Sequence, residues 1–388
     1  MIRLLITSIL YLQALLYPHH IPAQDTAVQS IWKIAESIPA ATAHARPLGV
    51  AGPVTGVTGN FLLAGGGSNF PGAMPWQGGQ KVYYDALYIY RRKAPGLIRI
   101  KKTYRLTEPV AYAASCSVPQ GIVYAGGENS AGISQNVFLI SMEENKTPVI
   151  TQLPSLPVPV TNASLVFHEG YIYLSGGIMA NGVSDGFWRM HLTDLRNGWE
   201  KLPPLPRAVA YALVLVQSSP KGKGMYVIGG RKKNDNGISD LYRSVWYYSF
   251  TQQVWEEKAP LPYPVSAAPG AATGEKGILV FGGDTGNTFH RSEQLIAAAA
   301  RETDAGKKRL LTEERAQLQA RHPGFCRNIL FYDTFSDNWR IAAQIPFDPP
   351  VTTTAVGWND EIYIPGGEIR AGVRTPSIWM MRYIHHER

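Results

Sequence analysis

The chain has few cysteines, few charged residues and, beyond its N-terminal segment, no long apolar run. Only Cys116 and Cys326 occur among 388 residues, too few for a disulfide framework, so we expect two buried thiols. Charged residues make up 17% and hydrophobic residues 45% of the chain, which excludes an intrinsically disordered protein. No later segment is long and apolar enough to cross a membrane.

Motifs of several common chemistries are also missing. His168, His191 and His290 stand alone, without the ligand spacing of a zinc site. There is no P-loop, dinucleotide fingerprint or serine nucleophile elbow, and we expect neither a metal nor an organic cofactor. No basic stretch is interleaved with aromatic residues, so the net charge of +8 indicates a solvated basic surface that could favour anionic ligands, and no nucleic acid partner.

Residues 1–24 have the pattern of a secretory signal peptide. Arg3 supplies the positive start, and residues 4–16 form an apolar stretch too short to span a bilayer. Cleavage is expected near Ala23 or Gln24, and no cysteine follows that would carry a lipid anchor. The sequence therefore predicts an exported protein with no membrane anchor after cleavage, periplasmic if the source is Gram-negative, whose mature domain is residues 25–388.

Among the features that are present, six Gly-Gly pairs stand out, and each closes a short apolar run. They are Gly65 and Gly66, Gly126 and Gly127, Gly176 and Gly177, Gly229 and Gly230, Gly282 and Gly283, and Gly366 and Gly367. Their second members are spaced by 61, 50, 53, 53 and 84 residues. A glycine pair recurring about every 50 residues is the kelch signature and predicts an all-β, six-bladed β-propeller.

The first and last segments of the mature chain complement each other. Each repeat divides into four strands, and the fourth often carries a tryptophan that we expect to fill the gap between blades. The last repeat has only three strands, whereas residues 30–39, with Trp32, resemble a fourth strand without a blade. We therefore expect the N-terminal strand to complete the last blade, which closes the ring and leaves no open edge.

The spacing of 84 residues in the fifth repeat requires an insertion. Residues 290–323 are rich in the strong helix formers Ala, Leu, Glu, Gln and Arg. We expect two helices at about 292–303 and 312–321, the second capped by Thr312, between the second and third strands of blade 5. Such a helical hairpin could wall a site or only decorate the surface.

Three unusual loops join the second and third strands of their blades: residues 67–85 in blade 1, the insertion in blade 5, and residues 366–377 in blade 6. In a closed ring these blades are neighbours, so the loops should meet on one sector of one face. Glu368 follows the last glycine pair and should start close to the central channel, with Arg370 and Arg374 in the same loop. A carboxylate beside guanidinium groups is a candidate general acid/base with an anion clamp.

Polar residues also follow other glycine pairs, namely Glu128, Arg231 and Asp284. The position of Glu368 alone is therefore not diagnostic, and a structural Glu–Arg pair that holds the loop is the alternative. The basic run that begins at Arg231 is interpreted as an exposed loop.

These features together carry a family resemblance. The run GGGSNFPGAMPWQGGQK at residues 65–81, the six repeats, the helical insertion and the motif Gly-Glu-x5-Arg (Gly367, Glu368, Arg374) resemble the N-acetylneuraminate epimerase family, also called sialic acid mutarotases. The chain looks like the cyclically permuted branch, because the motif lies in its last blade. The resemblance implies a periplasmic, cofactor-independent isomerase that interconverts the α and β anomers of N-acetylneuraminic acid, with Glu368 and Arg374 in its active site.

In this hypothesis Glu368 is the acid/base and Arg374 holds the carboxylate of the sugar. Arg370, Asn69 and Trp76 are candidate walls of the substrate pocket, although Trp76 could equally anchor its loop. A glycan-binding propeller without catalysis, a kelch scaffold for a protein partner and an isomerase of another acidic sugar remain open alternatives.

Overall fold

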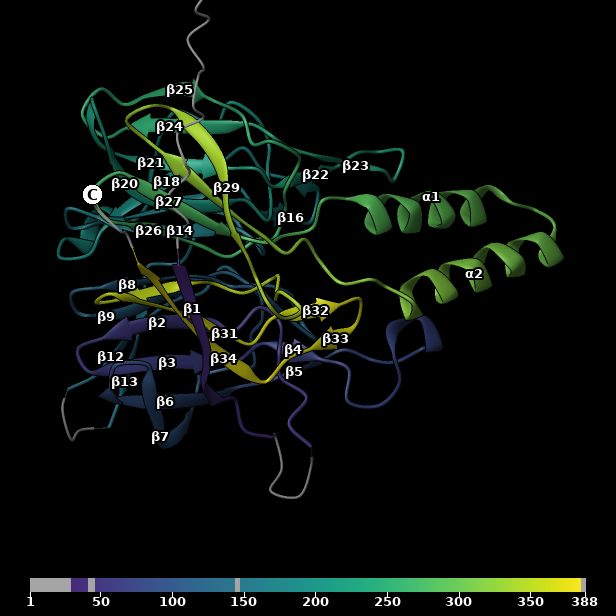
Figure 1. Cartoon of the computed structure of the whole chain (residues 1–388), viewed down its shortest axis with the longest axis horizontal. Helices are drawn as coiled ribbons and strands as arrows, with labels where there is room; N and C mark the ends of the chain where they lie inside the picture. The colour runs from purple at the N-terminus through teal and green to yellow at the C-terminus, as the bar shows by residue number, and fades with distance from the viewer. Residues whose placement is uncertain (1–28, 41–45, 144–146, 385–388) are drawn as a thin grey trace, which may run out of the picture.

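The computed structural model describes residues 29–40, 46–143 and 147–384. It contains six four-stranded sheets, which form the blades of a propeller (Figure 1). The predicted signal peptide, residues 1–24, lies outside the described residues. Within the described part of the chain, no helix is long and apolar enough to span a membrane.

The first three blades follow one another along the chain. Blade 1 contains β2 (Val54–Thr58), β3 (Phe61–Gly65), β6 (Ala86–Ala94) and β7 (Leu97–Arg105). Blade 2 contains β8 (Ala114–Val118), β9 (Gly121–Ala125), β12 (Val137–Ser141) and β13 (Val149–Leu153). Blade 3 contains β14 (Ser164–His168), β15 (Tyr171–Ser175), β18 (Phe187–His191) and β19 (Glu200–Lys201), with the short helix η2 (Leu195–Asn197) before β19.

The last three blades repeat this order, except that the fourth strand of blade 6 comes from the N-terminal part of the chain. Blade 4 contains β20 (Leu213–Ser219), β21 (Gly222–Ile228), β24 (Val245–Ser249) and β25 (Val254–Lys258). Blade 5 contains β26 (Gly270–Thr273), β27 (Gly277–Phe281), β28 (Asn328–Asp333) and β29 (Asn338–Gln344). Blade 6 contains β30 (Val356–Trp358), β31 (Glu361–Pro365), β34 (Ser377–Ile384) and the N-terminal β1 (Gln29–Ser37).

The ring is closed by the two ends of the domain, as predicted. β1 pairs antiparallel with β34, and Trp32 lies opposite Met381. The innermost strands contact one another in the order β2, β8, β14, β20, β26, β30 and back to β2. The buried apolar residues form six clusters, and each cluster joins two neighbouring blades. The core is therefore a ring of interfaces between blades, and closure buries what would otherwise be two exposed sheet faces.

The predicted role of the tryptophans is observed in the fourth strands. The indole N–H of Trp199 donates to the carbonyl of Pro154 in blade 2, and that of Trp255 donates to Pro203 in blade 3. Trp339 donates to the carbonyl of Ala259 in blade 4 at 2.9 Å. Each of these rings thus seals one blade against the preceding one.

The glycine pairs are needed because the chain makes a left-handed turn where blades converge. Gly366 and Gly367 have φ values of 64° and 104°, a region that residues with a side chain rarely adopt. In blade 1 this conformation falls on Gly66 and Gly67, with φ of 64° and 84°, so the doublet assigned from the sequence is one residue too early. A Cβ on Gly66 would collide with the carbonyl oxygen of Val110, which explains why glycine is required there.

A closed ring of backbone hydrogen bonds surrounds the central channel. Its members are Gly52, Tyr112, Asn162, Tyr211, Ala267 and Thr352, one from each blade, and each donates its N–H to the carbonyl of the preceding member at 2.7–3.2 Å. All six have positive φ between 52° and 63°, which is unfavourable for the five that are not glycine. The ring holds these residues in a strained conformation at fixed positions, and no motif in the sequence predicts it.

The helical insertion begins earlier than the sequence suggested. α1 (Asn287–Arg301) and α2 (Ala305–Ala320) lie between β27 and β28 of blade 5, as expected. Thr312 is not the N-cap of α2, because it lies inside the helix and its hydroxyl donates to the carbonyl of Lys308. The N-cap is Asp304, whose carboxylate accepts from the N–H of Lys307 and stabilises the exposed first turn.

Short ribbons extend the blades on the face that carries the helices, which we call the loop face. They are β4 (Ser68–Asn69) with β5 (Val82–Tyr83), β10 (Glu128–Asn129) with β11 (Gly132–Ile133), β16 (Ile178–Met179) with β17 (Gly182–Val183), β22 (Arg231–Lys233) with β23 (Ser239–Leu241), and β32 (Glu368–Arg370) with β33 (Val373–Arg374). Figure 1 shows β4, β16, β22 and β32 on the same side of the molecule as α1 and α2.

Candidate active site

The residue after each glycine pair is fixed at the rim of the channel on the loop face. These residues are Ser68, Glu128, Ile178, Arg231, Asp284 and Glu368. Each pairs in an antiparallel bridge with the residue that precedes a member of the hydrogen-bonded ring, as Glu368 does with Val351. Their side chains therefore all start at the channel mouth, where the repeat pattern placed Glu368.

The three unusual loops meet on this face. The short helix η1 (Pro75–Gln77) of the blade 1 loop contacts α2. Gly372 of the blade 6 loop packs so closely against Met74, Pro75 and Trp76 that a Cβ at Gly372 would crowd all three. The loops thus form one continuous structure over blades 5, 6 and 1.

A cavity of about 790 Å³ lies between the rim and the helical insertion, and we call it the loop-face cavity. Its size falls within the range of about 300–1,000 Å³ that is usual for small-molecule sites. Glu368, Asp284 and Arg231 line its floor, and Ile296 of α1 and Gln319 of α2 belong to its walls. Residues of the insertion therefore form one wall of the cavity.

Glu368 and Arg374 form an ion pair at the edge of this cavity. They lie directly opposite each other in the β32–β33 hairpin, which explains their spacing in the sequence. Arg374 Nη1 lies 3.1 Å from Glu368 Oε1, and the side chains are 5% and 20% exposed. Glu368 Oε1 also accepts a hydrogen bond of 2.8 Å from the N–H of Gly372. Oε1 is thus engaged by one hydrogen-bond donor and one cation, which leaves Oε2 as the oxygen better placed to react.

Arg374 is held tightly but its donors are not saturated. Its guanidinium lies 5.0 Å from the ring of Phe70 in the blade 1 loop. Although the ion pair with Glu368 is close, Nε and Nη1 have no well-aligned hydrogen-bond acceptor in the described part of the chain. Burial of unsatisfied N–H groups is costly, which is typical of a position kept for function.

The other predicted site residues lie outside the walls of the loop-face cavity. Arg370 is 52% exposed and forms an ion pair of 2.8 Å with Asp348, which also binds Arg327. Asn69 is buried, donates to the carbonyl of Gly49 and accepts from the hydroxyl of Tyr84, both at 2.8 Å. These contacts fix local structure, and the substrate-binding roles of both residues stay predictions.

Trp76 is half-buried in η1 and packs on Gly372. This contact supports its interpretation as a loop anchor that links the loops of blades 1 and 6. A direct contact with substrate stays a prediction.

His322 lines the loop-face cavity, a position that no motif in the sequence predicts. Its Nδ1 accepts a hydrogen bond from the N–H of Gly324 at 3.0 Å, so its proton is on Nε2 when the ring is neutral. Burial lowers the pKa of His322, Asp284 and Glu368 partly oppose this shift, and Arg370 adds to it. A neutral imidazole thus lies within electrostatic reach of the candidate acid/base.

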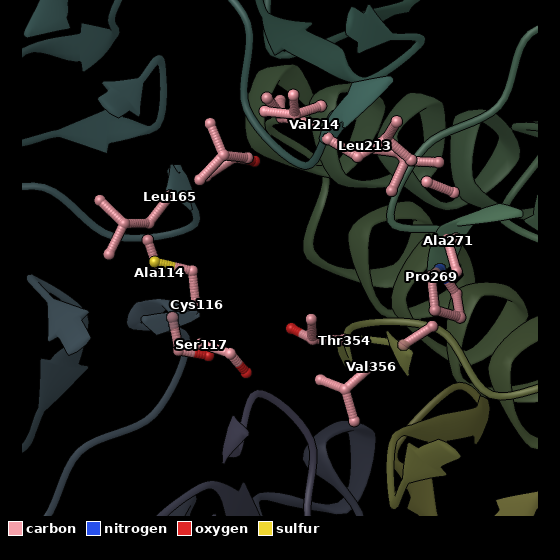
Figure 2. Close-up of a pocket in the computed structure, with 18 of the residues that line it drawn as sticks. Ala114, Cys116, Ser117, Leu165, Leu213, Val214, Pro269, Ala271, Thr354 and Val356 are labelled. Atoms are coloured by element: carbon pink, nitrogen blue, oxygen red, sulfur yellow. The ribbon is translucent and has the colours of Figure 1, made fainter. Parts of the chain in front are cut away.

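A second cavity, of about 410 Å³, lies in the channel on the other side of the hydrogen-bonded ring, and we call it the channel cavity. Figure 2 shows the small and apolar side chains around it, among them Ala114, Cys116, Leu165 and Thr354. None of the described residues that line it is charged.

Cys116 and Cys326 are unpaired as expected, but both are partly exposed, which corrects the expectation that they are buried.

Within the described residues, no group of three His, Cys, Asp or Glu side chains is arranged to hold a metal ion. The charged and titratable groups that line the loop-face cavity include four carboxylates, guanidinium groups, one ammonium and an imidazole, namely Asp235, Asp284, Glu293, Glu368, Arg231, Arg301, Arg315, Lys233 and His322. Such a set is suited to proton transfer and to binding an anion.

Comparison with known families matches residues 153–387 to the family N-acetylneuraminate epimerase. The match spans β14 to β34, that is blades 3 to 6, and includes Glu368 and Arg374.

Individual relatives carry the same name. The N-acetylneuraminate epimerase of Salmonella typhimurium is 25% identical over 232 residues, covering 59% of this chain and 58% of its own length. N-acetylneuraminate epimerase 1 of Escherichia coli O6:H1 is 25% identical and covers 62% of each chain, and the enzyme of Haemophilus influenzae is 25% identical and covers 57% of each. The chain thus spans about 58% of the length of the first of these relatives.

Proposed function

Because this chain belongs to the N-acetylneuraminate epimerase family, we propose that it is an isomerase that interconverts the α and β anomers of N-acetylneuraminic acid. The observation that supports this proposal most directly is the Glu368–Arg374 ion pair of 3.1 Å, which lies at the edge of a cavity large enough to hold a sugar. The names of the relatives support the reaction, and the enclosed, charged cavity supports a small acidic substrate.

The proposed reaction consists of two proton transfers around a ring opening. Glu368 Oε2 removes the proton from the anomeric hydroxyl, whose oxygen becomes the carbonyl oxygen as the bond from the anomeric carbon to the ring oxygen breaks. The ring oxygen takes a proton from the carboxyl group of Glu368, directly or through a water molecule. Rotation about the bond between the anomeric carbon and its neighbour, followed by the reverse steps, gives the other anomer.

Arg374 supports this chemistry by its position beside Glu368. The guanidinium and the N–H of Gly372 hold Oε1 in place, so that Oε2 faces the substrate. A positive charge there also stabilises the carboxylate between turnovers. Direct binding of the substrate carboxylate by Arg374 is the expectation from the sequence, and Arg231, which lines the cavity, is a second candidate for that contact.

The helical insertion gives the reaction an enclosed site. Ile296, Ala297 and Ala300 of α1 face the cavity beside the polar floor. Exclusion of water strengthens the electrostatic contacts of the substrate and limits exchange of protons with solvent. We propose this walling as the function of the insertion.

The proposal includes the cellular location and the order of the blades. The signal pattern of residues 1–24 supports export and, in a Gram-negative source, action in the periplasm. The position of Glu368 in the last blade supports a cyclic permutation relative to the family. Permutation leaves the site intact, because the ring is closed by β1 and β34.

Proton NMR of the pure α anomer, released in situ from an α-glycoside, tests the proposal directly. The wild-type protein should accelerate equilibration, and Glu368→Gln should reduce this acceleration by about a hundredfold or more. Glu128→Gln is the matched control, because Glu128 occupies the equivalent rim position in blade 2 and is bound by Lys81 and Tyr83 instead.

Two results would contradict the proposal. If the wild-type protein leaves the spontaneous rate unchanged, it is not a mutarotase of this sugar, and broadening of the sugar signals would then indicate a glycan-binding protein. If Glu368→Gln and Glu128→Gln are equally active, the Glu368–Arg374 pair is structural.

A further inference from the structure

Arg231 presents a rigidly held guanidinium group inside the loop-face cavity. Its Cζ lies 3.9 Å from the ring centre of Tyr211 and 4.2 Å from that of Phe289, so the group is stacked between two aromatic rings. Tyr211 belongs to the hydrogen-bonded ring and Phe289 to α1, which places both rings on well-defined elements. Packing of this kind restricts the guanidinium and leaves N–H donors at its edge, of which Nη1 donates to Ser266 Oγ.

The side chain of Arg231 extends from blade 4 to blade 5. Its backbone forms a bridge with Ala210 in blade 4, yet its Nη1 lies 3.3 Å from Ser266 Oγ and 3.9 Å from Asp284 Oδ2 in blade 5. Blade 5 is the neighbour of blade 6, where Glu368 lines the same cavity. The charged end of Arg231 thus lies one blade away from the proposed acid/base.

The partners of Arg231 leave it able to bind a ligand. At 3.9 Å, its ion pair with Asp284 is longer than a hydrogen bond, and Asp284 Oδ1 is engaged by the N–H of Gly286. The side chain of Arg231 is 16% exposed, and it lines the cavity. Its planar edge matches the geometry of a carboxylate, which accepts two parallel N–H bonds.

The position of Arg374 differs from that of Arg231. Its side chain is 5% exposed, lies by Phe70 and contacts the engaged oxygen of Glu368. It is not among the residues that line the loop-face cavity, whereas Arg231 is. We propose that Arg231 binds the carboxylate of the acidic substrate and that Arg374 is a positioning residue for Glu368.

This assignment rests on the proposed function, because it takes the substrate to be an acidic sugar. The anomeric carbon of N-acetylneuraminic acid carries both its carboxylate and the hydroxyl that Glu368 deprotonates in the proposed reaction. A carboxylate held by Arg231 therefore directs that hydroxyl toward blade 6. The same contact makes Arg231 the residue that distinguishes an acidic sugar from a neutral one, since a neutral sugar leaves the guanidinium without its anion.

The test is the dissociation constant of N-acetylneuraminic acid and of its uncharged methyl ester, measured by NMR titration together with the rate of anomer exchange. The wild-type protein should bind the acid roughly tenfold or more tightly than the ester, as expected for a charge-assisted pair. Arg231→Gln should remove this preference, and Arg231→Lys should restore part of it, because lysine keeps the charge without the planar fork.

Two further variants separate Arg231 from the other arginines. Arg374→Gln should keep the preference for the acid and lower the exchange rate of bound sugar, as expected for a positioning residue. Arg105→Gln is the charge-matched control, since Arg105 is 79% exposed on the outer strand of blade 1. Thermal unfolding of each variant shows that it is folded before binding is compared.

The assignment is overturned if Arg231→Gln, folded, retains the preference for the acid, or if Arg374→Gln removes it. It is also overturned if the wild-type protein binds acid and ester equally. Failure of the proposed function has a different result: a protein that binds the acid through Arg231 but leaves the exchange rate unchanged would support this assignment and refute the mutarotase.

Discussion

The two cavities along the channel share one scaffold but differ in chemistry. The channel cavity is lined by innermost strands such as β8 and β14, and its residues are small, apolar or neutral. The loop-face cavity is lined by residues that follow the glycine pairs and by the helical insertion, and it gathers Glu368, Arg231 and His322. The ring of six backbone hydrogen bonds lies between them.

The difference follows from what each part of a blade must do. Innermost strands converge on the axis, so their inward side chains must be small and their register is fixed by pairing. Loops beyond the glycine pairs leave the sheet and are free to vary in length and charge. Repetition therefore produces the scaffold, and the departures from repetition in blades 1, 5 and 6 produce the site.

The largest expected effect is a fall in the rate of anomer exchange when the ion pair at the edge of the loop-face cavity is removed. Arg374→Gln should lower the rate of anomer exchange by about a hundredfold, because Glu368 Oε1 loses its buried cationic partner and the carboxylate is no longer fixed. Saturation-transfer NMR at saturating sugar measures the loss, and Arg374→Lys should recover part of the rate. Equal rates for wild type and Arg374→Gln would remove Arg374 from the mechanism.

The wall of the cavity offers a second test. Glu293 of α1 is buried, and its carboxylate accepts hydrogen bonds of 2.7 Å from both the N–H and the hydroxyl of Ser239. Glu293→Ala should loosen the insertion, speeding its limited proteolysis and weakening sugar binding by roughly tenfold, since charged, buried hydrogen bonds are lost.

The matched control is Glu313→Ala. Glu313 is exposed on α2, and within the described residues its ion pair is with Arg309 of the same helix. If Glu293→Ala and Glu313→Ala bind the sugar alike, the insertion does not wall the site.

Protonation of His322 in the loop-face cavity should lower the stability of the folded protein by a moderate amount. Burial lowers the pKa of His322 in the folded protein, whereas in the unfolded chain this side chain takes up a proton near its ordinary pKa of about 6.5. As the pH falls below that value, the unfolded state binds more protons than the folded state, so stability decreases until the lowered pKa is passed. His322→Asn should lose less thermal stability than wild type between about pH 7 and 5. An identical loss in both proteins would show that His322 does not contribute.

Substitutions in the channel cavity should have little effect on the rate of anomer exchange. Although the Cys116 residue is partly exposed, its thiol is desolvated by the surrounding side chains and its pKa is raised, so alkylation should be slow, and Cys116→Ser should change the exchange rate by less than about twofold. A large loss of activity in Cys116→Ser would mean that the channel cavity takes part in the reaction, and the comparison between the two cavities would fail.

Much of the scaffold could be predicted because it depends on local, repeated signals. The glycine pairs mark a backbone conformation that other residues rarely adopt, and the fourth strand missing from the last repeat required the strand containing Trp32. The boundaries of the insertion were less accurate, since Asp304 caps α2 in place of Thr312. In blade 1 three consecutive glycines obscured which pair makes the turn.

The candidate site was predictable only where its residues lie close together in the sequence. Glu368 and Arg374 share one hairpin, so their spacing carried the information. Arg231 was interpreted as part of an exposed loop, because its stacking partners Tyr211 and Phe289 come from separate elements. The amide of Asn69 is engaged with Gly49 and Tyr84, and its contact with substrate stays a prediction.

The sequence by itself determined the number of blades, the closure of the ring and the identity of the Glu–Arg motif, because each depends on a repeat or on neighbours along the chain. Only the tertiary structure decided which charged side chains share a cavity. The packing of blades 4, 5 and 6 against one another brings Arg231, His322 and Glu368 together from three distant segments, and no local pattern of residues encodes such proximity.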